Sequence, residues 1–395
     1  MIIRLSASLF LLLYASFQVF AIDFNTTAQA LATESLSVKS LKLSGRASVE
    51  ELKGANSLPP IDAEFGYLWG EGETINKWNI SVSQSMDWPG AYAARRKGIK
   101  ATENAVSAAE RSALLAKALE IKLAMIDIVA AKRNLQLSSM LNDTISRMIE
   151  IVRDGVAKGE ITRLDLNKLE IEKISVSKQL AADKRAVFSS ITSLEALCGK
   201  KIDDIAANLT EFPDEILLPE ENYEALLSDD NPTIFEAKRN AISAKALAKA
   251  EKQMLLPGFS LGYTYENEVF DKWHGLTAGI SLPLFTSRGT VKAAKLRAES
   301  AEIDAVIAAI EETAKMKAER NQALSLFEEI EQYKAIFKND DNMKLLKKAF
   351  QAGEMTTHEY IGDLNYFVQA KREFIDAQYQ YALILARLNR LTILN

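Results

Sequence analysis

The feature that most constrains this sequence is an internal duplication at about half its length. At an offset of 194 residues, Gly159-Glu160 falls on Gly353-Glu354, and the apolar positions that follow fall on apolar or aromatic ones. At an offset of 195, Lys77-Trp78 falls on Lys272-Trp273. Each half combines a two-strand segment with a very long helical segment. A duplicated unit of this composition leaves few architectures open and points to a pore.

The N-terminal segment, residues 1–21, has the pattern of a removable secretion signal. Arg4 precedes an apolar run over residues 9–13, and small residues lead to Ala21. The uninterrupted apolar run is shorter than the ~20 residues that a membrane-spanning helix needs. We therefore expect an exported chain, and any insertion of the mature chain into a membrane must use strands. The single cysteine, Cys198, continues an apolar helical spacing and is expected to be a buried filler.

The distribution of charge argues against a nucleic-acid partner. The formal net charge is -5, and lysines and arginines are interspersed with acids along the helical segments. This is typical of the solvated faces of long paired helices, and nothing in it suggests a nucleic-acid partner.

Four segments alternate apolar and small polar residues with a period of two, at about residues 61–69, 80–86, 259–265 and 276–282. This alternation predicts strands with one apolar and one small polar face. Polar-rich connections at residues 70–76 and 267–271 separate the members of each pair. Each half is therefore expected to supply one β-hairpin, at about residues 61–86 and 258–282.

Strand length and aromatic placement favour a membrane barrel. Strands of ~9 to 11 residues with aromatics near the loop ends match the girdle of a transmembrane barrel; these aromatics are Trp69, Trp78, Tyr265 and Trp273. The alternation alone fits a soluble sandwich equally well. Four strands cannot close a barrel, because the smallest have about eight. Two copies of the chain would give eight strands, and three would give twelve with an aqueous lumen, which the serine, glycine and threonine face favours.

The remaining sequence predicts long helices. They cover residues 91–152 and 161–197 in the first half and 291–349 and 356–391 in the second. A helix of some 60 residues reaches ~90 Å, which is too long for a globular core. Each half thus forms a helical hairpin whose turn lies away from the strands. The apolar spacing Phe374, Tyr381, Leu385 and Leu388 resembles a coiled-coil seam.

The predicted fold class is mainly α with a membrane β-barrel part. The domain organisation is a signal peptide at 1–21, a first repeat at 22–199, a linker or equatorial belt at 200–231 and a second repeat at 232–395. The long helices fill about residues 91–199 of the first repeat and 286–392 of the second.

Four motifs carry a resemblance to a known family. They are the strand-to-helix passages at residues 80–84 and 279–285 and the hairpin turns at residues 159–165 and 353–359. In this duplicated order the chain resembles the outer-membrane efflux proteins of the TolC type over essentially its whole mature length. The resemblance implies a homotrimer whose twelve strands form one barrel in the lipid of a Gram-negative outer membrane, continued by twelve helices across the periplasm.

The same resemblance implies partners and a passive role. The helical tips would dock onto a periplasmic adaptor protein that links to an inner-membrane pump of the RND or ABC type. The protein would be a conduit with no cofactor and no reaction of its own. Its length is somewhat closer to that of the heavy-metal members, but the sequence does not separate metal ion, drug and polypeptide cargo.

The resemblance also suggests where a gate would lie, just after the tip-turn glycines Gly159 and Gly353. The acidic gate positions are Asp165 in the first half and Glu359 in the second. Three copies of a carboxylate around a narrow axis would attract cations and repel each other. A different interpretation is that both acids simply begin exposed helices, where the helix dipole stabilises them.

Other tip positions depart from the family pattern. The expected partner acid in the second half is replaced by Gly362, with Asp363 beside it, and the expected clamping arginine by Met355. Arg163 is a candidate substitute for that arginine, and Phe350 is a further tip candidate.

No enzymatic constellation is visible. His274 and His358 are expected in opposite end regions, which argues against a shared metal site. Two alternatives to the efflux duct stay open, namely an exported coiled-coil scaffold or adhesin without a pore, and a duct of the same fold that secretes a polypeptide.

Overall fold

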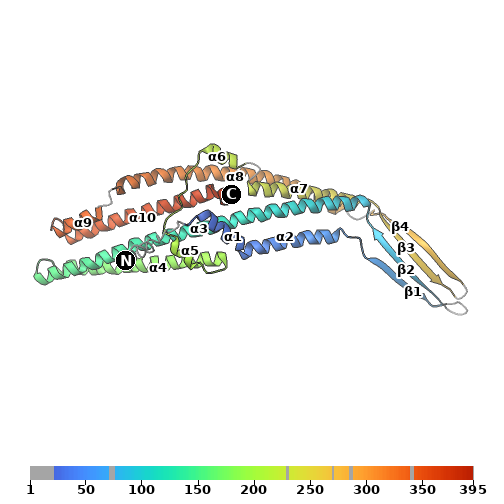
Figure 1. Cartoon of the computed structure of the whole chain (residues 1–395), viewed down its shortest axis with the longest axis horizontal. Helices are drawn as coiled ribbons and strands as arrows, with labels where there is room; N and C mark the ends of the chain where they lie inside the picture. The colour runs from blue at the N-terminus through green and yellow to red at the C-terminus, as the bar shows by residue number, and fades with distance from the viewer. Residues whose placement is uncertain are drawn as a thin grey trace, which may run out of the picture. The chain divides into compact units, whose positions relative to one another are not determined.

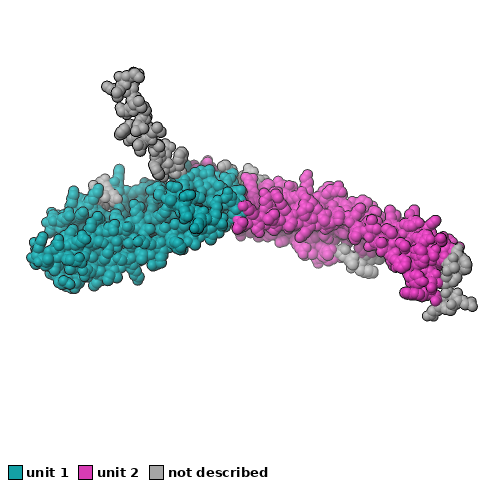
Figure 2. Space-filling view, turned by 60° about the horizontal axis from the view of Figure 1, so that its bottom comes forward, with its two compact units in different colours: residues 1–35, 117–217, 319–395 teal, residues 36–116, 218–318 magenta. Residues whose placement is uncertain are grey.

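A computed structural model describes residues 22–70, 76–227, 231–268, 271–283, 288–338 and 342–394. The predicted secretion signal lies outside these residues. The chain forms two compact units, shown in different colours in Figure 2. Unit 1 comprises residues 1–35, 117–217 and 319–395, and unit 2 comprises residues 36–116 and 218–318. Each unit takes chain from both predicted repeats, whose boundaries stay a prediction.

Unit 2 contains one antiparallel sheet of four strands in the order β1-β2-β3-β4 (Figure 1). The strands are β1 (Ile61–Leu68), β2 (Lys77–Met86), β3 (Gly258–Asn267) and β4 (Lys272–Ser281). Both predicted hairpins are confirmed, and the pairing of β2 with β3 joins the two halves of the duplication. Among the described residues, β1 and β4 each have a strand partner on one side only.

The register places the apolar residues of all four strands on one face. Directly paired residues share a face, and Val82 pairs with Ala63 and with Tyr263, which in turn pairs with Leu276. This face is exposed, and Leu276 is 89% accessible. Serine, glycine and threonine occupy the opposite face, as in the row Ser83, Gly262 and Thr277. The predicted two-faced strands are thereby confirmed.

One predicted girdle aromatic lies on the other face. Trp78 and Tyr265 share the apolar face, and their ring centroids are 5.4 Å apart. Trp69 follows the end of β1 and contacts the Tyr67 ring at 5.3 Å. Trp273, however, pairs with Glu266 and so belongs to the small polar face. The register places the even-numbered residues of both β2 and β4 on the apolar face, so Trp78 belongs to it and Trp273 does not.

Unit 1 is built on four helices that pack around one apolar cluster. They are α3 (Pro89–Lys158), which enters from unit 2, α4 (Arg163–Cys198), α9 (Asn342–Gln351) and α10 (Thr357–Leu388). The fully buried members of the cluster include Ile145 and Val152 of α3, Leu169 of α4 and Leu364 of α10. Helices from both halves of the duplication therefore share one core.

The remaining elements complete the two units. They are α1 (Phe24–Glu34), α2 (Leu36–Ala55), α5 (Asp203–Asn208), α6 (Glu220–Leu226), α7 (Pro232–Gln253), α8 (Arg288–Phe337) and the short 3-10 helix η1 (Arg390–Leu394). None of the described helices combines the length and the apolar character that crossing a bilayer requires. Cys198 is buried and free, as predicted.

The helix predicted over residues 291–349 differs from the structure. Helix α8 ends at Phe337, and α9 begins at Asn342. Lys338 after α8 is in a turn, and residues 339–341 lie outside the described part of the chain. The predicted seam of α10 is observed within unit 1, where the Phe374 ring lies 5.7 Å from those of Tyr333 and Phe337.

Candidate functional site

The turns of the two helical hairpins have the same backbone design. Gly159 and Gly353 adopt left-handed φ values of 77° and 74°, which favour glycine because it lacks a Cβ. In the first turn the Glu160 N–H donates to the Gly155 carbonyl at 2.9 Å. In the second, the Glu354 N–H donates to the Ala349 carbonyl at 3.0 Å. Both are six-to-one bonds of a Schellman motif, which ends a helix and satisfies its last carbonyls.

The first candidate gate acid lies three residues after the N-cap of α4. Thr162 is that N-cap, and its hydroxyl accepts a bond from the Asp165 N–H at 3.2 Å. The same hydroxyl donates to the Asp165 carboxylate at 2.6 Å. Lys168 lies 3.6 Å from this carboxylate in an exposed pair. In the protomer, Asp165 therefore stabilises the first turn of α4.

The second candidate acid completes a full capping box. Glu359 accepts bonds from the Thr356 N–H at 2.7 Å and from the Thr356 hydroxyl at 2.9 Å. The Glu359 N–H returns a bond to that hydroxyl at 3.3 Å. The bond from the Thr356 backbone, and then that from its side chain, hold the pKa of Glu359 below its ordinary value. The carboxylate is thus kept ionised, because both bonds favour the charged form.

The other predicted tip residues fall into two groups. Arg163 and Asp363 are exposed, and Arg163 forms no ion pair within the described part of one protomer, so its role as a substitute latch stays a prediction. Phe350 and Met355 instead pack against the core cluster. The Phe350 ring lies 5.1 Å from that of Tyr360. In this structure Phe350 is a packing residue of the tip.

The two cap threonines are functional positions that the sequence reading missed. A detectable signal was present, since Thr-x-x-Asp and Thr-x-x-Glu at residues 162–165 and 356–359 match the capping-box pattern. The structure thus supports the interpretation of Asp165 and Glu359 as helix-start acids. It leaves the gate role as a prediction, because a ring of acids requires further copies of the chain.

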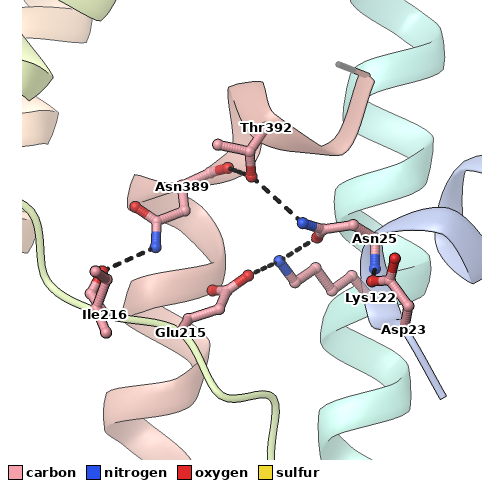
Figure 3. Close-up of polar contacts among 7 residues, drawn as sticks. All are labelled: Asp23, Asn25, Lys122, Glu215, Ile216, Asn389 and Thr392. Atoms are coloured by element: carbon pink, nitrogen blue, oxygen red, sulfur yellow. Dashed lines mark hydrogen bonds and ion pairs between the residues drawn. The ribbon is translucent and has the colours of Figure 1, made fainter. Parts of the chain in front are cut away.

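A fully buried lysine lies at the centre of a polar cluster in unit 1, separate from the hairpin turns (Figure 3). Lys122 of α3 is 0% exposed, and its Nζ donates to the Asn25 side-chain oxygen at 2.6 Å and pairs with the Glu215 carboxylate. The Asn25 amide donates to the Thr392 hydroxyl at 3.4 Å. The Asn389 amide donates to the Ile216 carbonyl at 3.3 Å. The cluster ties both terminal segments and residues 209–219 to α3.

Another polar cluster in unit 1 joins helices from the two halves of the duplication. Asp183 of α4 is buried and accepts a bond from Arg372 of α10 at 2.9 Å. Ser138 of α3 also donates to Asp183, and Gln179 donates to its second oxygen at 3.0 Å. Charge pairing and hydrogen bonds together satisfy this buried carboxylate. The cluster fixes α10 against the first helical hairpin.

The two histidines belong to different units. His274 lies on β4 in unit 2, and His358 lies at the start of α10 in unit 1. No group of three or more histidine, cysteine, aspartate or glutamate residues suited to a metal ion occurs among the described residues.

Sequence comparison gives no match: no protein-family model and no curated protein matches this chain. Solved structures do match it. A membrane protein from Pseudomonas aeruginosa is 17% identical, with a TM-score of 0.75 over 94% of this chain and 95% of that one. The outer membrane protein VceC from Vibrio cholerae is 16% identical, with a TM-score of 0.73 over 92% and 96%. The Campylobacter jejuni CmeC outer membrane channel is 16% identical, with a TM-score of 0.72 over 93% and 85%.

At these identities the likeness establishes the fold. The chain has the fold of these three membrane proteins, and the TolC-type fold predicted from its sequence is confirmed at that level. The heavy-metal subtype stays a prediction.

Proposed function

We propose that this protein is the outer-membrane exit duct of a tripartite efflux system. The observation that carries the proposal is the sheet, which exposes a continuous apolar face and backs it with small polar residues. In a transmembrane barrel, each strand turns its apolar residues outward to the lipid and its polar residues inward to the lumen. The structurally similar CmeC is an outer membrane channel, which supports the same role here.

The sheet needs further copies to close. Each of its edge strands, β1 and β4, has one partner within the described chain, and an open edge in lipid leaves backbone groups without hydrogen bonds. Pairing β4 of one copy with β1 of the next is a head-to-tail contact that generates a ring. Three copies supply twelve strands, enough for a lumen lined by the serine and glycine face.

The proposal includes partners and a location. The homotrimer would sit in the lipid of a Gram-negative outer membrane, with its helices in the periplasm. A periplasmic adaptor would bind the helical tips and link them to an inner-membrane pump of the RND or ABC type. The protein would perform no reaction and hold no cofactor, and the pump would select the cargo, whether metal ion, drug or polypeptide.

Conductance in a planar bilayer, with the oligomer mass measured on the same sample, tests the duct. We expect discrete, cation-preferring steps from a detergent-solubilised trimer. A soluble species that needs no detergent and does not conduct would contradict the proposal and favour the coiled-coil scaffold or adhesin.

We further propose that Glu359 contributes charge to a gate, in addition to capping α10. Glu359→Gln is expected to lower the cation preference severalfold at neutral pH. Because hydrogen bonds from Thr356 lower the pKa of Glu359, the charge of the folded protein persists below the ordinary pKa of 4.5. The cation preference should therefore be lost only as the pH falls through that lowered pKa. Reversal potentials across a salt gradient measure it.

Thr356→Val is the matched control, since it removes both hydrogen bonds of the Thr356 hydroxyl but keeps the carboxylate and its bond from the Thr356 backbone N–H. It should leave the preference intact at neutral pH and move its loss to higher pH. If Thr356→Val and Glu359→Gln reduce the preference equally at neutral pH, Glu359 acts only as a cap. Asp165→Asn and Thr162→Val extend the same comparison to the first turn.

A further inference from the structure

A cavity of about 300 Å³ lies among α3, α9 and α10 in unit 1. This volume is at the lower end of the roughly 300–1,000 Å³ that small-molecule sites occupy. Its residues come from both halves of the duplication, and the gate acids are not among them. The proposed duct assigns this cavity no role.

The apolar part of the lining is rich in methionine. Met140, Met148 and Met343 all line the cavity, so three of the nine methionines of the chain meet at this one place. Met148 and Leu364 are buried, whereas Met140 is partly accessible. Flexible, polarizable methionine side chains adapt to apolar ligands of variable shape. The inner part of the cavity is thus suited to an aliphatic chain.

The polar part of the lining is cationic. Arg147, Lys344 and Lys347 line the cavity, and no aspartate or glutamate is among its described lining residues. Arg147 and Lys347 make no hydrogen bond or ion pair within the part of the chain that the structure describes. Two unpaired cations beside an apolar cavity favour an anionic headgroup, and an arginine can hold a carboxylate through two parallel hydrogen bonds.

Tyr360 supplies a hydrogen-bond donor to the cavity lining. This lining residue is 3% exposed, and its hydroxyl makes no hydrogen bond with any described residue. The hydroxyl oxygen itself is not among the buried polar atoms that lack a partner, so it reaches solvent at the cavity and is free to donate to a ligand. Burial raises the pKa of Tyr360, with Arg147 opposing the shift, so the phenol stays neutral and remains a donor. A ligand oxygen beside Arg147 would give this hydroxyl an acceptor.

We propose that the cavity binds a small aliphatic carboxylate, with its headgroup at Arg147, Lys347 and Tyr360 and its chain among the three methionines. Such a ligand would contact α3, α9 and α10 together. The proposal does not depend on the duct function, since it rests on a cavity within one protomer.

Methionine-methyl NMR of the full-length protein in lipid nanodiscs, titrated with decanoate, tests the site. The signals of Met140, Met148 and Met343 should shift with saturation. Met86 and Met254 belong to unit 2 and serve as internal controls, because decanoate that merely enters the lipid would not select the cavity methionines. No selective shift of the three cavity signals up to the onset of decanoate micelles would overturn the proposal.

Variants and analogues test the headgroup assignment. Arg147→Gln with Lys347→Gln should weaken decanoate binding at least about tenfold, and Tyr360→Phe should weaken it severalfold. Lys184→Gln with Arg185→Gln makes the same charge change at exposed positions of α4 and should leave binding unchanged. Decanol or decyltrimethylammonium binding as tightly as decanoate would overturn the anionic headgroup.

Discussion

Val82→Arg should largely abolish assembly of the proposed outer-membrane trimer. Val82 lies midway along β2, is 41% exposed and shares the apolar face with Ala63 and Tyr263. An arginine on the lipid face near the bilayer midplane costs about 2–4 kcal/mol, and a trimer would carry three of them. The fraction of the protein recovered as a membrane-inserted trimer measures the effect.

Ser81→Arg is the matched control. Ser81 is the neighbouring residue on the same strand and belongs to the opposite, small polar face, where it pairs with Glu64 and Thr264. In a water-filled lumen the same arginine stays hydrated and lies near an acid, so the trimer yield should remain close to that of the wild type. Equal losses in the two variants would contradict the assignment of lipid and lumen faces.

The strands and the long helices could be predicted because their signals are local. Period-two alternation is preserved along every strand, so it predicted both hairpins and both faces. Trp273 shows the limit of this approach. It was predicted to belong to the same aromatic girdle as Trp78, but the face of a strand residue depends on the pairing register, which the sequence alone does not give.

The tip could be predicted in part. Gly159 and Gly353 were recognisable as turn glycines, and both adopt the left-handed conformation. The acids after them were assigned to a gate by resemblance. The structure shows that within one protomer they cap the first turns of α4 and α10. Whether Asp165 and Glu359 also face a common axis depends on neighbouring copies of the chain.

The buried charges could not be predicted, since their partners are remote in sequence. Asp183 and Arg372 are 189 residues apart, and Lys122 and Glu215 are 93 apart. A lysine or aspartate in a long helix usually faces solvent. Only the packing of helices from the two halves shows which charges are removed from water and must be paired.

Lys122→Met should destabilise unit 1 by about 3–5 kcal/mol per protomer, because removing one partner of a buried pair leaves the other charge uncompensated. The Glu215 carboxylate is 13% exposed, and its Oε2 atom already lacks a hydrogen-bond partner among the described residues. Asn25 would also lose its contact with Nζ. Thermal unfolding of the purified trimer, with proteolysis at residues 209–219 as a local readout, measures the loss.

Two comparisons separate pairing from packing. Lys334→Met removes an exposed pair with Glu331, formed at 2.9 Å, and should cost about 0–1 kcal/mol. Adding Glu215→Leu to Lys122→Met removes both buried charges and should recover most of the lost stability, since apolar replacement of a whole buried pair is often neutral. A double variant as unstable as Lys122→Met alone would mean that Lys122 acts through its packing and its bond to Asn25. A Lys122→Met loss no larger than that of Lys334→Met would show that the buried pair does not hold the terminal segments to α3.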